Sequence, residues 1–117
     1  LVSPSCIIKS DIQNTKGNLF INSCFINTGV KIGNFNFFNT QAIIEHDVKI
    51  GNNNIFSPGV IIGGDTEIGN DNFFGIGVNV SDGISICSNV VVGMGSNVTK
   101  SITKPGVYYG TPAKKYS

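Results

Sequence analysis

A single histidine, His46, is the strongest candidate for acid–base chemistry in this chain. It lies between two carboxylates, Glu45 and Asp47, in the segment NTQAIIEHDVKIGN. An imidazole has an ordinary pKa of about 6.5, so it can act as a base near neutral pH without a large shift. A carboxylate bonded to the ring would fix its tautomer and stabilise its protonated form. The residue types and spacing therefore indicate a general base, and an ordinary turn residue is the alternative interpretation.

Composition and charge exclude two classes of partner. The chain of 117 residues carries a net charge of +1, with eight lysines and no arginine. It therefore lacks the basic stripe and the guanidinium groups that are typical of a nucleic-acid site. No apolar run approaches the roughly 18 residues that a membrane helix needs. We expect neither a nucleic-acid partner nor a membrane partner.

The cysteines and lysines give weaker signals. The three cysteines have no C-x-x-C spacing and leave one thiol unpaired: Cys6, Cys24 and Cys87. They support neither a zinc site nor a disulfide scaffold, so we expect reduced thiols, no metal and a cytoplasmic location. Four lysines gather near the C-terminus, at Lys100, Lys104, Lys114 and Lys115. This basic segment is predicted to be either a solvated tail or a contact for the phosphates of an anionic ligand.

An internal repeat decides the fold. Steps of six from Ile8 reach, with one exception at Asn14, only large apolar residues: Phe20, Ile26, Ile32, Phe38, Ile44, Ile50, Phe56, Ile62, Ile68, Phe74, Val80, Ile86, Val92 and Val98. Every third step from Phe20 to Phe74 is a phenylalanine with an asparagine two residues earlier. The segments VKIGNF, VKIGNN and TEIGND begin at Val30, Val48 and Thr66, again eighteen residues apart. The true repeat is therefore eighteen residues long.

A six-residue period fits a short strand followed by a corner, and three such units close one triangular coil. The sequence therefore predicts an all-β fold, a single-stranded left-handed parallel β-helix with 18-residue coils about 4.8 Å apart. We expect the glycines and asparagines of IGN, GIG and GMG to supply the positive φ angles at the corners. Residues 1–117 form one β-helix domain. Leu1 opens directly on patterned sequence without an initiator methionine, as in a fragment of a longer chain or a processed protein.

The residue before each inward apolar position should point outwards, which sorts the outer surface into three faces. One face reads Leu19, Phe37, Ile55, Phe73 and Val91; the second reads Phe25, Ile43, Ile61 and Asn79; the third reads Lys31, Lys49, Glu67 and Ser85. Two adjacent apolar faces on one prism favour burial against identical prisms, so we expect a homotrimer. His46 falls at the corner between the second apolar face and the polar face, at the edge of that interface.

The segments AIIEHDVKIGNNNIFSPGVIIGGDTEIGN, GIGVNV and GVYYGTPAKK resemble a family of bacterial sugar acetyltransferases. This is the hexapeptide-repeat family that contains the sialic acid O-acetyltransferases and the UDP-4-amino-sugar N-acetyltransferases. The likeness runs from about Ser3 to Lys115. It implies acetyl-CoA as the donor, a trimer, and a catalytic histidine followed by a carboxylate, which correspond to His46 and Asp47.

The same resemblance implies that the backbone amide of Gly64 holds the acyl oxygen. It also implies that the pantetheine of acetyl-CoA runs past Gly75, Ile76, Gly93 and Met94. Gly64 follows His46 by eighteen residues, so both would lie about 4.8 Å apart along the axis and could address one tetrahedral centre. A second histidine that some members carry nine residues after the first is replaced by isoleucine here. The family also usually has an N-terminal nucleotide-binding-like domain that shapes the sugar site, and residues 1–117 contain no such segment.

We therefore expect an acetyl-CoA-dependent acetyltransferase that acts on an amino group of a nucleotide-linked sugar, with His46 assisting direct attack on the thioester. A sugar or serine O-acetyltransferase on the same fold is one alternative, and a non-catalytic trimerising module is another. A carbonic anhydrase of this fold would need three zinc-binding histidines, and the single histidine excludes it. Glu45 remains an alternative to Asp47 as the carboxylate that supports the base.

Overall fold

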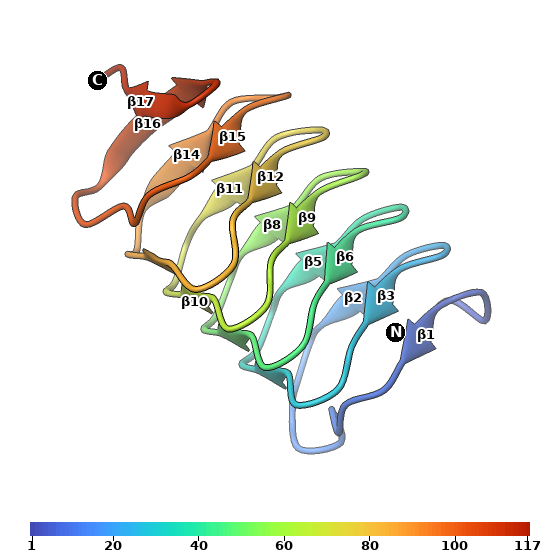
Figure 1. The fold of residues 1–117 in the computed structure, drawn as a ribbon. Helices are drawn as coiled ribbons and strands as arrows, with labels where there is room; N and C mark the ends of the chain where they lie inside the picture. The colour runs from blue at the N-terminus through green and yellow to red at the C-terminus, as the bar shows by residue number, and fades with distance from the viewer.

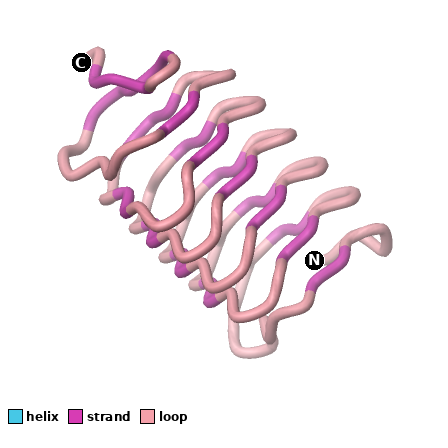
Figure 2. The backbone as a smooth tube through the Cα atoms, in the orientation of Figure 1, coloured by secondary structure: helices cyan, strands magenta, loops and turns pink.

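The computed structural model describes residues 1–117 as a rod of stacked triangular coils, 37 × 21 × 21 Å in extent (Figure 1). Most strands are only two residues long and alternate with four-residue corners. Figure 2 shows these short strands separated by loops along the tube. All strand pairs in the coils are parallel. The predicted left-handed parallel β-helix is confirmed.

Three sheets run along the rod, one on each side of the triangle. The seven-stranded sheet contains β2 (Leu19–Phe20), β5 (Phe37–Phe38), β8 (Ile55–Phe56), β11 (Phe73–Phe74), β14 (Val90–Val92), β16 (Gly106–Gly110) and β17 (Ala113–Lys115). The six-stranded sheet contains β1 (Ile7–Ile8), β3 (Phe25–Ile26), β6 (Ile43–Ile44), β9 (Ile61–Ile62), β12 (Asn79–Val80) and β15 (Asn97–Val98). The four-stranded sheet contains β4 (Lys31–Ile32), β7 (Lys49–Ile50), β10 (Glu67–Ile68) and β13 (Ser85–Ile86).

The register follows the eighteen-residue repeat. Ile43 pairs with Ile61, and Phe37 pairs with Ile55, so equivalent residues of successive coils are vertical neighbours. At the C-terminal end, β16 and β17 form an antiparallel hairpin. The lysine-rich segment is therefore partly folded, a feature that the repeat did not predict.

The core is a column of stacked side chains. Phe20, Phe38, Phe56 and Phe74 stack with ring centroids 4.8, 4.8 and 5.0 Å apart and are at most 1% exposed. The asparagine two residues before each phenylalanine is also buried. The amide of Asn54 donates to Gly69 O at 2.9 Å, and its Oδ1 accepts the backbone N–H of Asn72 at 3.0 Å. In the N-x-F motif, the phenylalanine thus stacks in the core, and the asparagine forms hydrogen bonds with backbone groups of a buried corner.

The prediction for positive φ was correct at GIG and GMG but wrong at IGN. Gly77 and Gly95 have φ of 69° and 70°. In the IGN corners the positive φ falls two residues after the glycine, for example at Asn53 with φ 59°. Gly51 is instead required by packing, because a Cβ there would lie 2.7 Å from the carbonyl oxygen of Gly69 in the next coil.

The outer faces are as predicted. Leu19, Ile55, Phe73 and Val91 are 38–41% exposed on the seven-stranded sheet, and Ile61 is 39% exposed on the six-stranded sheet. The polar column of the four-stranded sheet contains an exposed ion pair between Lys49 and Glu67, 3.9 Å apart. Two adjacent sides of the prism therefore present apolar columns and the third presents a polar one.

The cysteines are free thiols, as expected. Cys24 is 1% exposed, and its Sγ donates to the carbonyl oxygen of Asn39 at 2.9 Å. Burial, together with the neighbouring Cys6, raises the pKa of the Cys24 thiol to about 12. Cys24 is therefore an unreactive core thiol. The fold has no helix that is long and apolar enough to cross a membrane.

Candidate active site

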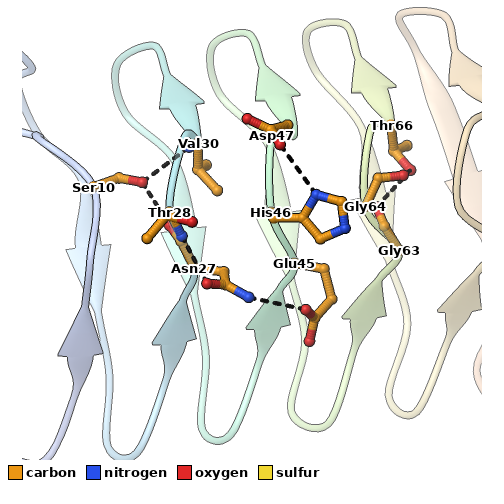
Figure 3. Close-up of polar contacts among 10 residues, drawn as sticks. All are labelled: Ser10, Asn27, Thr28, Val30, Glu45, His46, Asp47, Gly63, Gly64 and Thr66. Carbon is orange, nitrogen blue, oxygen red and sulfur yellow. Dashed lines mark hydrogen bonds and ion pairs between the residues drawn. The ribbon is translucent and has the colours of Figure 1, made fainter.

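His46 lies in the corner between β6 and β7, on the outside of the prism. Its side chain is 52% exposed and extends along the axis towards the next coil, where it lies over Gly64 (Figure 3). The corner joins the second apolar face to the polar face, which is the position that the sequence predicted. An imidazole placed here can be reached by a ligand from outside.

Asp47 fixes the imidazole of His46 through a hydrogen bond with Nδ1. Asp47 has a left-handed backbone conformation, φ 57°, and its Oδ2 accepts a hydrogen bond from His46 Nδ1 at 3.1 Å. Because an ionised carboxylate can only accept, the proton of the neutral ring lies on Nδ1 and the lone pair on Nε2. Nε2 is therefore the atom that can act as a base.

Two further carboxylates, those of Asp65 and Glu45, lie near His46. Asp65, also at positive φ, occupies the equivalent corner of the next coil. A ring nitrogen of His46 and one carboxylate oxygen each of Asp47 and Asp65 lie within 4.8 Å of one another. Glu45 is turned towards the preceding coil, where its Oε2 accepts a hydrogen bond from Asn27 Nδ2 at 3.1 Å. The sequence analysis did not identify Asp65, although a step of eighteen from Asp47 leads directly to it.

These carboxylates raise the pKa of His46 above its ordinary value. The hydrogen bond that His46 donates to Asp47 is the main cause. Desolvation, the second-largest effect, lowers the pKa, and the charges of Asp65, Asp47 and Glu45 raise it. The protonated ring is thus stabilised by a direct hydrogen bond to Asp47 and, more weakly, by the charges of the nearby carboxylates. Between the two carboxylates considered from the sequence, the geometry selects Asp47.

Gly64 permits the close approach of the imidazole to the next coil. A Cβ atom at Gly64 would lie 2.6 Å from His46 Nε2 and 2.8 Å from Cε1. Gly64 is buried beneath the ring, its carbonyl accepts from Gly83 N at 2.9 Å, and Asp65 N donates to His46 O at 3.0 Å. The N–H of Gly64 donates to no protein acceptor. An oxygen of a bound substrate can therefore take this donor.

The four residues predicted to line the donor lie at a different corner, between the seven-stranded and six-stranded sheets. Ile76 and Met94 are 55% and 73% exposed there. A Cβ at Gly75 would lie 2.7 Å from Met94 N, and one at Gly93 would lie 3.1 Å from Tyr109 Cβ. A single prism therefore does not bring these four residues to His46.

The C-terminal hairpin caps that second corner. Gly110 N donates to Ser96 Oγ at 3.0 Å, and Asn97 Nδ2 donates to Thr111 Oγ1 at 3.2 Å. The hairpin places the lysines of β17 beyond the coil that contains Met94. Lys114 and Lys115 therefore lie on the edge strand at the C-terminal end of the seven-stranded sheet.

Comparisons with known proteins agree with this architecture. A family model described as bacterial transferase hexapeptide (six repeats) matches residues 23–64. The comparison with curated protein sequences found no significant match.

Among solved structures, the acetyltransferase domain of PglB from Neisseria gonorrhoeae FA1090, in complex with acetyl coenzyme A, is 27% identical, with a TM-score of 0.81 over 98% of this chain and 53% of that chain. WeeI from Acinetobacter baumannii AYE is 25% identical, with a TM-score of 0.80 over 98% of this chain and 57% of that chain. PerB from Caulobacter crescentus, in complex with CoA and GDP-perosamine, is 20% identical, with a TM-score of 0.57 over 99% of this chain and 56% of that chain.

The chain thus spans little more than half the length of these three solved chains. The family model and the structural match to the PglB acetyltransferase domain confirm the predicted resemblance to hexapeptide-repeat acetyltransferases.

Proposed function

We propose that this β-helix catalyses acetyl transfer from acetyl-CoA to an amino group of a nucleotide-linked sugar. The observation that carries the proposal is the arrangement at one corner, where Asp47 fixes His46 with Nε2 free, next to the unpartnered N–H of Gly64. The similarity to the PglB acetyltransferase domain in complex with acetyl coenzyme A supports the donor. The fold that is shared with PerB, which was solved with GDP-perosamine, favours a nucleotide sugar as acceptor.

The geometry divides the reaction among three residues. His46 Nε2 takes the proton of the attacking amine as its nitrogen forms a bond to the thioester carbon. Asp47 stabilises the resulting imidazolium, and the Gly64 N–H donates to the carbonyl oxygen as that oxygen becomes negative. When the carbon–sulfur bond breaks, the CoA thiolate leaves and accepts the proton. No covalent enzyme intermediate is needed.

The acidic surroundings of His46 favour an amine over a hydroxyl acceptor. Asp47, Asp65 and Glu45 would attract a cationic ammonium group to the site, whose proton must be lost before attack. A sugar or serine O-acetyltransferase remains the alternative for a neutral acceptor. A non-catalytic trimerising module is the alternative from a different class, and it would bind no acetyl-CoA.

The two apolar outer faces support a homotrimer, with the corner that contains Ile76 and Met94 directed towards the threefold axis. In such an assembly the donor contacts of one subunit could lie next to His46 of its neighbour, so the site would be shared. The reduced, unpaired thiols are compatible with a cytoplasmic enzyme.

The test is an acceptor screen with acetyl-CoA in which the released CoA thiol is measured. The panel should contain amino-sugar nucleotides, the corresponding neutral sugars and serine. His46→Ala should lower the turnover of the best acceptor by about 100-fold or more while the affinity for CoA changes little. Unchanged turnover would remove His46 from the mechanism. A lack of saturable acetyl-CoA binding by the wild-type protein would favour the non-catalytic module.

A further inference from the structure

One buried polar residue beside the site has no role in the function proposed so far. Thr66 is 0% exposed and occupies a column of inward-pointing corner residues that is otherwise apolar. The other members of the column are Ile12, Val30, Val48 and Ile84. Thr66 therefore places a hydroxyl where every other coil has an aliphatic side chain.

The hydroxyl of Thr66 donates to the carbonyl oxygen of Gly63 at 2.6 Å (Figure 3). No backbone N–H donates to that oxygen. In the corners between the seven-stranded and six-stranded sheets, a backbone bond closes the turn, as from Ala42 N to Asn39 O at 3.1 Å. No such bond closes the corners between the six-stranded and four-stranded sheets, and at Gly63 the hydroxyl of Thr66 supplies a partner for the carbonyl oxygen.

The carbonyl of Gly63 and the N–H of Gly64 belong to the same peptide unit. In a planar trans peptide these two groups point in opposite directions. A buried hydroxyl that holds the Gly63 oxygen inwards therefore directs the Gly64 N–H away from the core, to the side where the imidazole of His46 lies.

This peptide unit has little else to fix its orientation. It is flanked by two glycines, whose backbone torsion angles have a wider allowed range than those of other residues. The preceding and following peptides are held by the next coil, through Gly63 N to Val80 O and Gly83 N to Gly64 O, both at 2.9 Å. The peptide between them contacts no backbone partner. Within the protein, the hydroxyl of Thr66 is the one hydrogen-bond partner of this peptide.

We propose that Thr66 is a positioning residue that holds the Gly63–Gly64 peptide with its N–H directed at the acyl oxygen. This inference rests on the proposed acetyl transfer for its kinetic consequence, but its structural content is independent of the substrate. Without the hydroxyl, the peptide samples orientations in which the donor no longer faces the reacting carbonyl.

The kinetic test compares Thr66→Val, Thr66→Ser and the wild-type protein, with Val30→Thr as the matched exchange in the same column. Loss of one oxyanion donor costs about 10²–10³ in kcat, so weakening its support should cost about tenfold or more in Thr66→Val. The KM for acetyl-CoA and the acid limb of the pH–rate profile should stay unchanged, because Asp47 still sets the pKa of His46. Thr66→Ser should restore kcat, and Val30→Thr should keep it.

A second measurement does not need turnover. In spectra of protein labelled with ¹⁵N-glycine, with the Gly64 signal assigned by its loss in Gly64→Ala, Thr66→Val should shift, broaden or double that signal and Thr66→Ser should not. A Gly64 signal unchanged in Thr66→Val, or a serine variant as impaired as the valine variant, overturns the proposal. If the wild-type protein transfers no acetyl group to any acceptor, the proposed function fails, and the Gly64 signal alone decides the role of Thr66.

Discussion

Replacing Gly64 by alanine is the sharpest steric test of the site. The new Cβ would lie 2.6 Å from His46 Nε2, 2.8 Å from Cε1 and 3.0 Å from Cδ2. Non-bonded heavy atoms are comfortable at about 3.5–4.0 Å, so the ring must retreat by about 1 Å. A displacement of about 1 Å costs about 100-fold in rate, and that is the expected loss of kcat.

The fold should tolerate this substitution. Gly64 does not adopt a positive φ, and His46 is 52% exposed, so the ring can swing outwards into solvent. Gly83→Ala is the matched control, because Gly83 occupies a corner of the same kind, has φ +73° and would bring a Cβ within 4 Å of no atom. Its left-handed backbone should cost about 1–2 kcal/mol of stability while kcat per folded molecule is kept.

The assay is steady-state release of the CoA thiol, together with thermal unfolding of each variant. Gly64→Ala should lower kcat at a nearly unchanged unfolding temperature. Gly83→Ala should keep kcat and lower the unfolding temperature. If Gly64→Ala kept its kcat to within about threefold, contact between the ring and the next coil would be irrelevant to the rate. Parallel losses of rate and stability in both variants would also refute the steric argument.

Three further predictions follow from the carboxylates and the outer faces. Asp47→Asn removes the main cause of the raised pKa of the imidazole, so the acid limb of kcat/KM should move to lower pH while the plateau falls. A larger effect of Glu45→Gln would show that Glu45, and not Asp47, supports the base. Asp65→Asn should move the same limb in the same direction but less, since Asp65 acts only through its charge; titration of the imidazole by NMR checks this without turnover. Phe37→Asp with Phe73→Asp should dissociate the proposed trimer and abolish activity together. An active wild-type monomer in light scattering would contradict both the proposed trimer and the shared site.

The repeat made most of the fold predictable. Stacked coils require that residues eighteen apart share one environment, so the inward column of Phe38 and the outward column of Phe37 followed directly from their spacing. The torsion angles at the corners did not follow as well. The glycine of IGN is conserved from coil to coil here because the next coil packs against it, whereas the strained residue is Asn53 or its equivalent two positions later. Composition alone cannot separate these two reasons for a small residue.

The candidate site was only partly predictable. A lone histidine followed by an aspartate was visible in the sequence, and the structure joins the two by a hydrogen bond. That contact depends on the left-handed conformation of Asp47, which turns its carboxylate back to the ring. Asp65 and Thr66 were overlooked because each is unremarkable in its own hexapeptide. Their significance appears only when they are compared with the residues eighteen positions before them.

The chemistry of this protein is concentrated where the repeat is broken. The column of His46 reads Ser10, Thr28, His46, Gly64 and Asp82, so an imidazole is followed by a residue that has no side chain to displace it. In the adjacent column the valine pattern gives way to threonine in that same next coil, where the hydroxyl orients the glycine peptide. A second site one coil further along would need a histidine in place of Gly64 and a glycine in place of Asp82, which would destroy the first. Two adjacent coils therefore cannot both hold such a corner.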